Sequence, residues 1–223
     1  MGDLAAIIFD FDGVLLESEY AGNRMLAELL TELGHETTTE DALREFVGLA
    51  GPQFLAAIER RIGGPLPEAF LERRKAQTLA ALRDGVPAVA GAVEFIRSLP
   101  PGLPKAVASS SSMRWLGRHL ELLGLAEAFG PHVYSGREHV ERTKPEPDLY
   151  LHAARELGVD IAECAIVEDS EIGVTGALAS GARVIGLAAG AHCLGGHGEM
   201  LRALGANEIA HSFAELREML RLG

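Results

Sequence analysis

AAIIFDFDGVLLESE, residues 5–19, joins an apolar run to two aspartates and a glycine. The apolar part is typical of a buried strand in a parallel sheet. Ligands of open α/β sheets bind at the carboxyl ends of strands, where Asp10 and Asp12 would lie, and Gly13 permits a sharp turn there. Two carboxylates one residue apart can hold a divalent cation or act as nucleophile and proton donor. The alternative is a solvated acidic turn.

Composition limits the classes of protein to which the chain can belong. Its 223 residues, 48% of them hydrophobic, can bury one sizeable core, or one core and a small satellite domain. The net charge of −12 argues against nucleic-acid and membrane partners. Asp3 stands where a signal peptide would carry a basic residue, and no apolar run approaches the roughly 20 residues of a membrane span, so we expect a cytoplasmic protein. Cys164 and Cys193 show no framework spacing, and we expect no disulfide.

Hydrophobic periodicity divides the chain into two parts. From Glu17 to about Arg83 the pattern predicts only helices, and from Val86 onward strands and helices alternate. The alternation predicts an α/β fold, a Rossmann-like, doubly wound parallel sheet whose central strand comes from residues 1–16. We therefore predict a core domain of residues 1–16 and 89–223, with residues 17–88 inserted as a helical cap between hinges at 15–20 and 84–91. The expected elements are helices 18–33, 40–46, 52–62, 67–83, 113–123, 147–157 and 171–179, and strands 105–108, 132–135, 164–167 and 183–187.

A run of serines follows one of the predicted strands. In VASSSS, residues 107–112, the Ser109 hydroxyl lies next to the free N–H groups of a helix start, where it can bind a phosphate oxygen. Ser110 is a second candidate for substrate binding. Ser111 and Ser112 are interpreted as helix N-caps.

Two further segments carry charged residues to the same edge of the predicted sheet. TKPEPD, residues 143–148, presents Lys144 before a proline, where it can hold a phosphate and neutralise a carboxylate. CAIVEDSEIG, residues 164–173, ends an apolar strand in Glu168 and Asp169. Together with Asp10 and Asp12, four carboxylates would then surround one lysine and repel each other, so the pocket needs a divalent cation. An all-oxygen set of hard ligands selects Mg²⁺.

These motifs resemble those of the haloacid dehalogenase (HAD) superfamily over essentially the whole chain. DFDGV at 10–14, Ser109, Lys144-Pro145 and VEDSEIG at 167–173 stand in the family's usual order and spacing. The helical insert is similar to the small cap of the branch that contains β-phosphoglucomutase and many sugar-phosphate phosphatases. Other branches carry an additional Asp where this chain has Gly173, and we expect Glu168 to take over part of its role.

The resemblance implies a role for each motif residue. Asp10 would attack phosphorus and form an aspartyl-phosphate, while Asp12 would protonate the leaving alcohol and then activate water. Ser109 and Lys144 would complete the oxyanion-binding site. Asp12 favours phosphate esters, because members that cleave carbon–halogen bonds typically lack it. The implied metal ligands are Asp10, Asp12 through its backbone carbonyl, Glu168 directly or through water, and Asp169.

The predicted function is a Mg²⁺-dependent phosphatase acting on a small phosphorylated metabolite, a sugar phosphate or sugar-acid phosphate, as a monomer. A β-phosphoglucomutase-like phosphomutase is the alternative, although residues 20–23 and 47–51 lack the cap His and Arg of mutases. Lys75 is a candidate to reach the substrate from the cap, against the alternative of a solvated helix face. A catalytically silent ligand-binding or regulatory protein is the alternative from another class. The filled acidic and basic positions argue against it.

Two features are assigned no chemistry. His192, Cys193 and His197 in GAHCLGGHG offer three ligands, too few for a closed structural zinc site, and we interpret the segment as a Gly-rich loop. Trp115 is interpreted as a packing residue.

Overall fold

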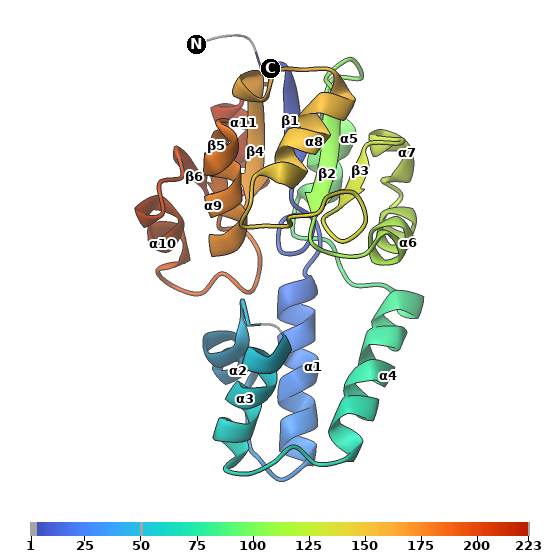
Figure 1. Ribbon diagram of the computed structural model, residues 1–223, viewed down its shortest axis with the longest axis vertical. Coiled ribbons are helices and arrows are strands. Elements are labelled where there is room, and N and C mark those ends of the chain that lie inside the picture. Colours follow the sequence, from blue (N-terminus) through green and yellow to red (C-terminus); the bar gives the residue numbers. More distant parts are fainter. Residues whose placement is uncertain (1–3, 50, 223) are drawn as a thin grey trace. The chain divides into compact units, whose positions relative to one another are not determined.

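The computed structural model describes residues 4–49 and 51–222, and its contacts divide the chain into two compact units (Figure 1). One unit comprises the described residues up to Glu17 and those from Pro87 onward, and the other comprises Ser18–Val86. Each unit has a hydrophobic core of its own. Asp3 and Ala50, which the sequence analysis used, lie outside the described residues.

The first unit is built on a parallel sheet with the order β3-β2-β1-β4-β5-β6. In Figure 1 the blue strand β1 lies between the green β2 and the orange β4, which confirms the predicted parallel sheet and its central strand. The strands are β1 (Ala6–Phe9), β2 (Lys105–Ser109), β3 (Val133–Ser135), β4 (Cys164–Glu168), β5 (Arg183–Leu187) and β6 (Glu208–Ala210).

Helices cover both faces of this sheet because side chains alternate along each strand. Ile8 belongs to a core cluster that includes side chains of α8, α9 and α10. The next residue, Phe9, packs edge-on against Phe95 of α5 and Phe129 of α7, with ring centroids 6.2 Å apart in both pairs. The helices are α5 (Ala92–Ser98), α6 (Met113–Leu123), α7 (Ala126–Phe129), α8 (Asp148–Leu157), α9 (Glu171–Ser180), α10 (His197–Ala203) and α11 (Phe213–Met219), with a 3-10 turn at Ile161–Glu163.

Among its described residues, the second unit forms helices and no strand, as predicted. Its apolar core includes Leu30 of α1, Phe46 of α2 and Ile58 of α3. Thr38 begins α2 with a capping box, in which it exchanges hydrogen bonds with Asp41. The helices are α1 (Ser18–Glu32), α2 (Thr39–Phe46), α3 (Gly51–Ile62) and α4 (Ala69–Asp84). Across the described residues of both units, the helices lack the combination of length and apolar character that a bilayer crossing requires.

The helices and strands that sequence reasoning missed are all short, although the equally short β3 was predicted at 132–135. Strand β6 and helices α5, α7, α10 and α11 are each seven residues or fewer. Such lengths are too short for a hydrophobic period to repeat convincingly. By contrast, α6 and β5 have the predicted bounds.

Candidate active site

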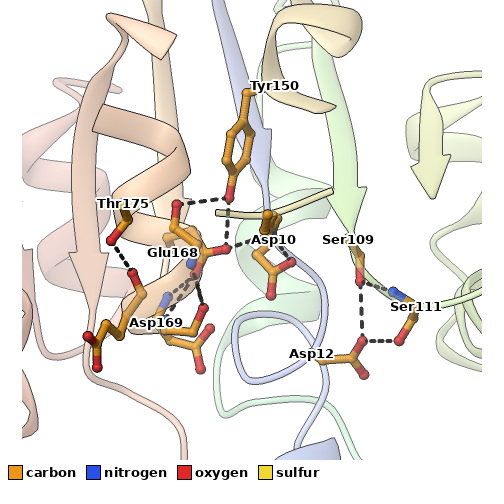
Figure 2. Close-up of polar contacts among 12 residues, drawn as sticks. Asp10, Asp12, Ser109, Ser111, Tyr150, Glu168, Asp169 and Thr175 are labelled. Carbon is orange, nitrogen blue, oxygen red and sulfur yellow. Dashed lines mark hydrogen bonds and ion pairs between the residues drawn. The ribbon is translucent and has the colours of Figure 1, made fainter. Parts of the chain in front are cut away.

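The carboxyl ends of three neighbouring strands bring the predicted motif residues together (Figure 2). Asp10 directly follows β1, Ser109 ends β2, and Glu168 ends β4 with Asp169 after it. Lys144 comes from the loop before α8 and is buried with the carboxylates. The structure therefore assembles residues that are far apart in the sequence at one edge of the sheet.

Lys144 forms a buried double ion pair. Its Nζ donates to Asp10 Oδ1 and to Glu168 Oε1, both at 2.6 Å. Burial alone would lower the pKa of Lys144, but the charges of Asp10 and Glu168 raise it well above its ordinary value. Lys144 is therefore a fixed cation at neutral pH.

A negative charge on Asp10 remains unfavourable, although Lys144 is paired with it. Burial raises its pKa well above the ordinary range, Lys144 lowers it, and the carboxylates of Glu168 and Asp169 raise it further. Oxygens of Asp10, Glu168 and Asp169 lie within 4.8 Å of one another. Buried oxygen donors that repel each other fit a hard divalent cation such as Mg²⁺.

Glu168 is held on both carboxylate oxygens. Its Oε1 accepts from Lys144 and from the Tyr150 hydroxyl at 2.8 Å. Its Oε2 accepts from the backbone N–H groups of Asp169 and Ser170, each at 2.9 Å, and from the Ser170 hydroxyl. Burial works to raise the pKa of Glu168, but Lys144 and these hydrogen bonds give a net lowering. With all these donors in place, Glu168 is better suited to orient Lys144, and to reach a metal through water, than to bind the metal directly.

Asp12 lies apart from the group of three carboxylates. Its Oδ2 accepts from Ser109 Oγ at 3.2 Å and from Ser111 Oγ at 2.5 Å, as Figure 2 shows, and its Oδ1 accepts from Trp115 Nε1 at 3.0 Å. Ser111 was predicted to be an N-cap but binds Asp12, whereas Ser112 does cap α6. These donors fix the direction of the Asp12 side chain.

Sequence reasoning missed two side chains of the site, Trp115 and Tyr150. Trp115 contacts Asp12 from the first turn of α6, and Tyr150 contacts Glu168 from α8. Burial first, and then Glu168, raise the pKa of Tyr150 well above its ordinary value, so its hydroxyl stays a donor. The available signal was that a buried Tyr or Trp requires a partner for its polar group.

Two further residues, Ser110 and Lys75, were predicted to bind the substrate. The Ser110 carbonyl accepts a hydrogen bond from Arg137 Nε at 2.9 Å. Lys75 is exposed on α4, in the other unit. Their roles in substrate binding stay predictions.

A family model described as haloacid dehalogenase-like hydrolase matches residues 7–187. The chain belongs to this family. As a HAD hydrolase it is an enzyme, and its fold and motifs confirm the resemblance found in the sequence.

Relatives and solved structures agree with this assignment. Hexitol phosphatase A of Escherichia coli is 31% identical over 181 residues, which cover 80% of each chain. The chloroplastic protein SUPPRESSOR OF QUENCHING 1 of Arabidopsis thaliana is 34% identical over 190 residues, which are 82% of this chain but 18% of that protein.

Two crystal structures show the same fold. A HAD family hydrolase of Deinococcus radiodurans with bound phosphate and sodium is 35% identical, with a TM-score of 0.88 over 99% of this chain and 96% of that one. A putative β-phosphoglucomutase of Thermotoga maritima is 25% identical, with a TM-score of 0.70 over 96% and 98%.

Gly13 allows a close approach between two motifs of the HAD site. Its φ of 85° lies in the left-handed region, where other residues are strained. A Cβ at this position would overlap the carboxylate of Asp169. The glycine of the first motif is therefore required both by the turn and by the neighbouring acid.

Gly173 stands where the family resemblance places an additional Asp in other HAD branches. A Cβ at Gly173 would overlap the carboxylate of Glu168, which is buried and held by Lys144, Tyr150 and Ser170. The Glu168 carboxylate thus fills the space in which a side chain at 173 would begin. Its position is consistent with the expectation that Glu168 takes over part of the role of the additional Asp of other branches.

We predict that Gly173→Ala destabilises the protein by about 1–3 kcal/mol, because the new methyl group displaces a carboxylate that cannot move freely. In a Glu168→Ala background the same change should cost less than about 0.5 kcal/mol. Urea unfolding of the two single variants and the double variant measures the coupling.

Gly117→Ala is the matched control, since a Cβ there meets open space on helix α6. It should leave stability unchanged or raise it. Additive costs of the changes at 168 and 173 would show that the two positions do not compete for the same space.

Proposed function

We propose that this HAD hydrolase is a Mg²⁺-dependent phosphatase that hydrolyses a small phosphorylated metabolite, a sugar phosphate or sugar-acid phosphate, through an aspartyl-phosphate on Asp10. The observation that carries the proposal is the buried Asp10 carboxylate, paired with Lys144 and followed two residues later by Asp12. The similarity to hexitol phosphatase A supports the substrate class. The phosphate bound in the related Deinococcus structure supports the ligand chemistry.

The carboxylate group fits the metal that the family implies. Asp10 and Asp169 would bind Mg²⁺ directly, with the backbone carbonyl of Asp12, and Glu168 would act through water. When bound, the ion would neutralise charge on the transferring phosphoryl group.

The side chains then have separate tasks in two displacements. An oxygen of Asp10 forms a bond to phosphorus as the bond to the leaving oxygen breaks, and Asp12 donates a proton to that oxygen. In the second displacement Asp12 takes a proton from water, whose oxygen attacks phosphorus and releases phosphate from Asp10. Lys144 keeps Asp10 in place and offers positive charge to the phosphoryl oxygens, with the Ser109 hydroxyl as a further donor.

The insert lacks the cap His and Arg of mutases, which favours hydrolysis over phosphate transfer. A mutase must retain a bisphosphate intermediate, which needs donors or cations for the second phosphate. Residues 20–23 and 47–51 contain neither His nor Arg. A phosphomutase remains the second candidate because of the similarity to the putative β-phosphoglucomutase.

We predict that Asp10→Asn folds normally. Its turnover of p-nitrophenyl phosphate should fall at least about a thousandfold below that of the parent protein, since the covalent step requires the carboxylate. Stopped assays with Mg²⁺, together with circular dichroism, measure both properties. Asp160→Asn, which changes an exposed acid and keeps its capping oxygen, should retain full activity. Near-normal turnover by Asp10→Asn would refute the proposed nucleophile.

A product assay separates the phosphatase from the mutase. With β-glucose 1-phosphate and a trace of glucose 1,6-bisphosphate, we expect no net isomerisation, because the insert offers little to hold the second phosphate. A panel of phosphorylated sugars and sugar acids should yield inorganic phosphate from at least one member. Glucose 6-phosphate forming faster than inorganic phosphate would instead establish the mutase.

Trp115 should contribute to catalysis through Asp12. Trp115→Phe keeps an aromatic ring but removes the donor to Asp12 Oδ1, and we expect kcat to fall by about tenfold with KM unchanged. Ser112→Ala is the control, because it removes the cap of α6, at a cost of about 1 kcal/mol, without a contact to Asp12. An unchanged kcat in Trp115→Phe would show that the hydrogen bond has no catalytic role.

A further inference from the structure

A second group of possible metal ligands lies in the loop after β5 and at the start of α10. His192, Cys193 and His197 each present a ligand atom within 4.8 Å of the other two. His192 Nε2 is 3.4 Å from Cys193 Sγ, and the two imidazole centroids are 5.5 Å apart. A tetrahedral Zn²⁺ site places its ligand atoms roughly 3–4 Å apart, and the spacing of these three atoms is close to that.

The carboxylate of Asp169 lies beside His192 and is the candidate for a fourth ligand, which the sequence did not reveal. Asp169 Oδ2 lies 2.8 Å from His192 Nε2, and His197 Nε2 lies 2.7 Å from the Asp169 backbone carbonyl. Both histidines therefore pack around one residue of the active site. Since His192 is 4% exposed, this contact is shielded from water.

The loop is shaped to hold the His192 imidazole. A Cβ at Gly190 would lie 2.6 Å from two atoms of the His192 ring, so the ring occupies space that only a glycine leaves. Cys193 and His197 are half-buried, which leaves the cluster a route to solvent. The position of the ring, beside Asp169 and Cys193, is thus set by the backbone.

We propose that His192, Cys193, His197 and the Oδ2 atom of Asp169 form a second metal site, which takes Zn²⁺ or a similar borderline ion. Two imidazoles, one thiolate and one carboxylate match the ligand preferences of Zn²⁺, whereas the all-carboxylate group beside it suits Mg²⁺. Burial, and then the charge of Asp169, raise the pKa of the Cys193 thiol to about 12. Binding at neutral pH therefore exchanges the thiol proton for the metal and releases that proton to solvent.

Occupation of this site has a consequence for the hydrolase. Zn²⁺ on one oxygen of Asp169 withdraws negative charge from the Mg²⁺ group, and two dications that share a carboxylate repel each other. Each ion therefore weakens the binding of the other, by the same factor. Zn²⁺ would inhibit the enzyme, and Mg²⁺ would oppose the inhibition. This coupling rests on the proposed function, but the Zn²⁺ site itself does not.

Co²⁺ is the probe for the site, since it replaces Zn²⁺ and absorbs in the near ultraviolet when a thiolate binds it. Titration of the full chain with Co²⁺ should produce this band, and added Zn²⁺ should remove it. Cys193→Ser should abolish the band, and Cys164→Ser, which changes the buried cysteine of β4, should retain it. A missing band in the parent protein, or a band that persists in Cys193→Ser, overturns the site whether or not the protein is a phosphatase.

Competition with a chromophoric chelator measures the Zn²⁺ affinity without relying on absorption by a thiolate-bound ion. His197→Ala should weaken Zn²⁺ binding at least about tenfold. In the parent protein the affinity should fall as Mg²⁺ is raised. Affinity that is unaffected by His197→Ala overturns the ligand set. Affinity that is unaffected by Mg²⁺ overturns the sharing of Asp169.

Discussion

The buried ammonium of Lys144, bound to Asp10 and Glu168, is the interaction on which the site depends. The two bonds join segments 134 and 24 residues apart in the sequence. Charges are tolerated in a protein interior only when they are paired, and removal of one partner leaves an uncompensated charge. The lysine therefore holds the end of β1, the end of β4 and the loop before α8 in fixed positions relative to one another.

Much of this arrangement could be predicted because its residues end strands. Asp10 and Glu168 follow apolar runs, and parallel strands bring such ends to one edge of the sheet. Trp115 could not be assigned in the same way, because it lies within α6 and not at a strand end, so no local pattern marks its contact with Asp12. A long-range side-chain contact depends on rotamers and helix placement, neither of which a local pattern encodes. The same reason leaves Lys75 without an assigned partner.

Sequence reasoning also did not predict the short strand β6 or the position of Asp169 beside His192. Strand β6 has three residues. It is recognised as a strand by its pairing with β5, because its own sequence pattern is too short to indicate one. For His192, the sequence showed two neighbouring ligands but not the carboxylate of Asp169, which comes from a different strand end. In both cases the missing information is which segments become neighbours in space.

A side chain at position 173 and the carboxylate of Glu168 would occupy the same space. A chain of this type that first acquires Asp at 173 must force two acidic side chains into one volume. A chain that first loses Glu168 gives up a partner of Lys144. We expect either single step to impair the protein, and the two changes together to place one carboxylate in the same space. In evolutionary terms, we therefore expect residues 168 and 173 to be constrained as a pair, so that a change at one is tolerated only with a change at the other.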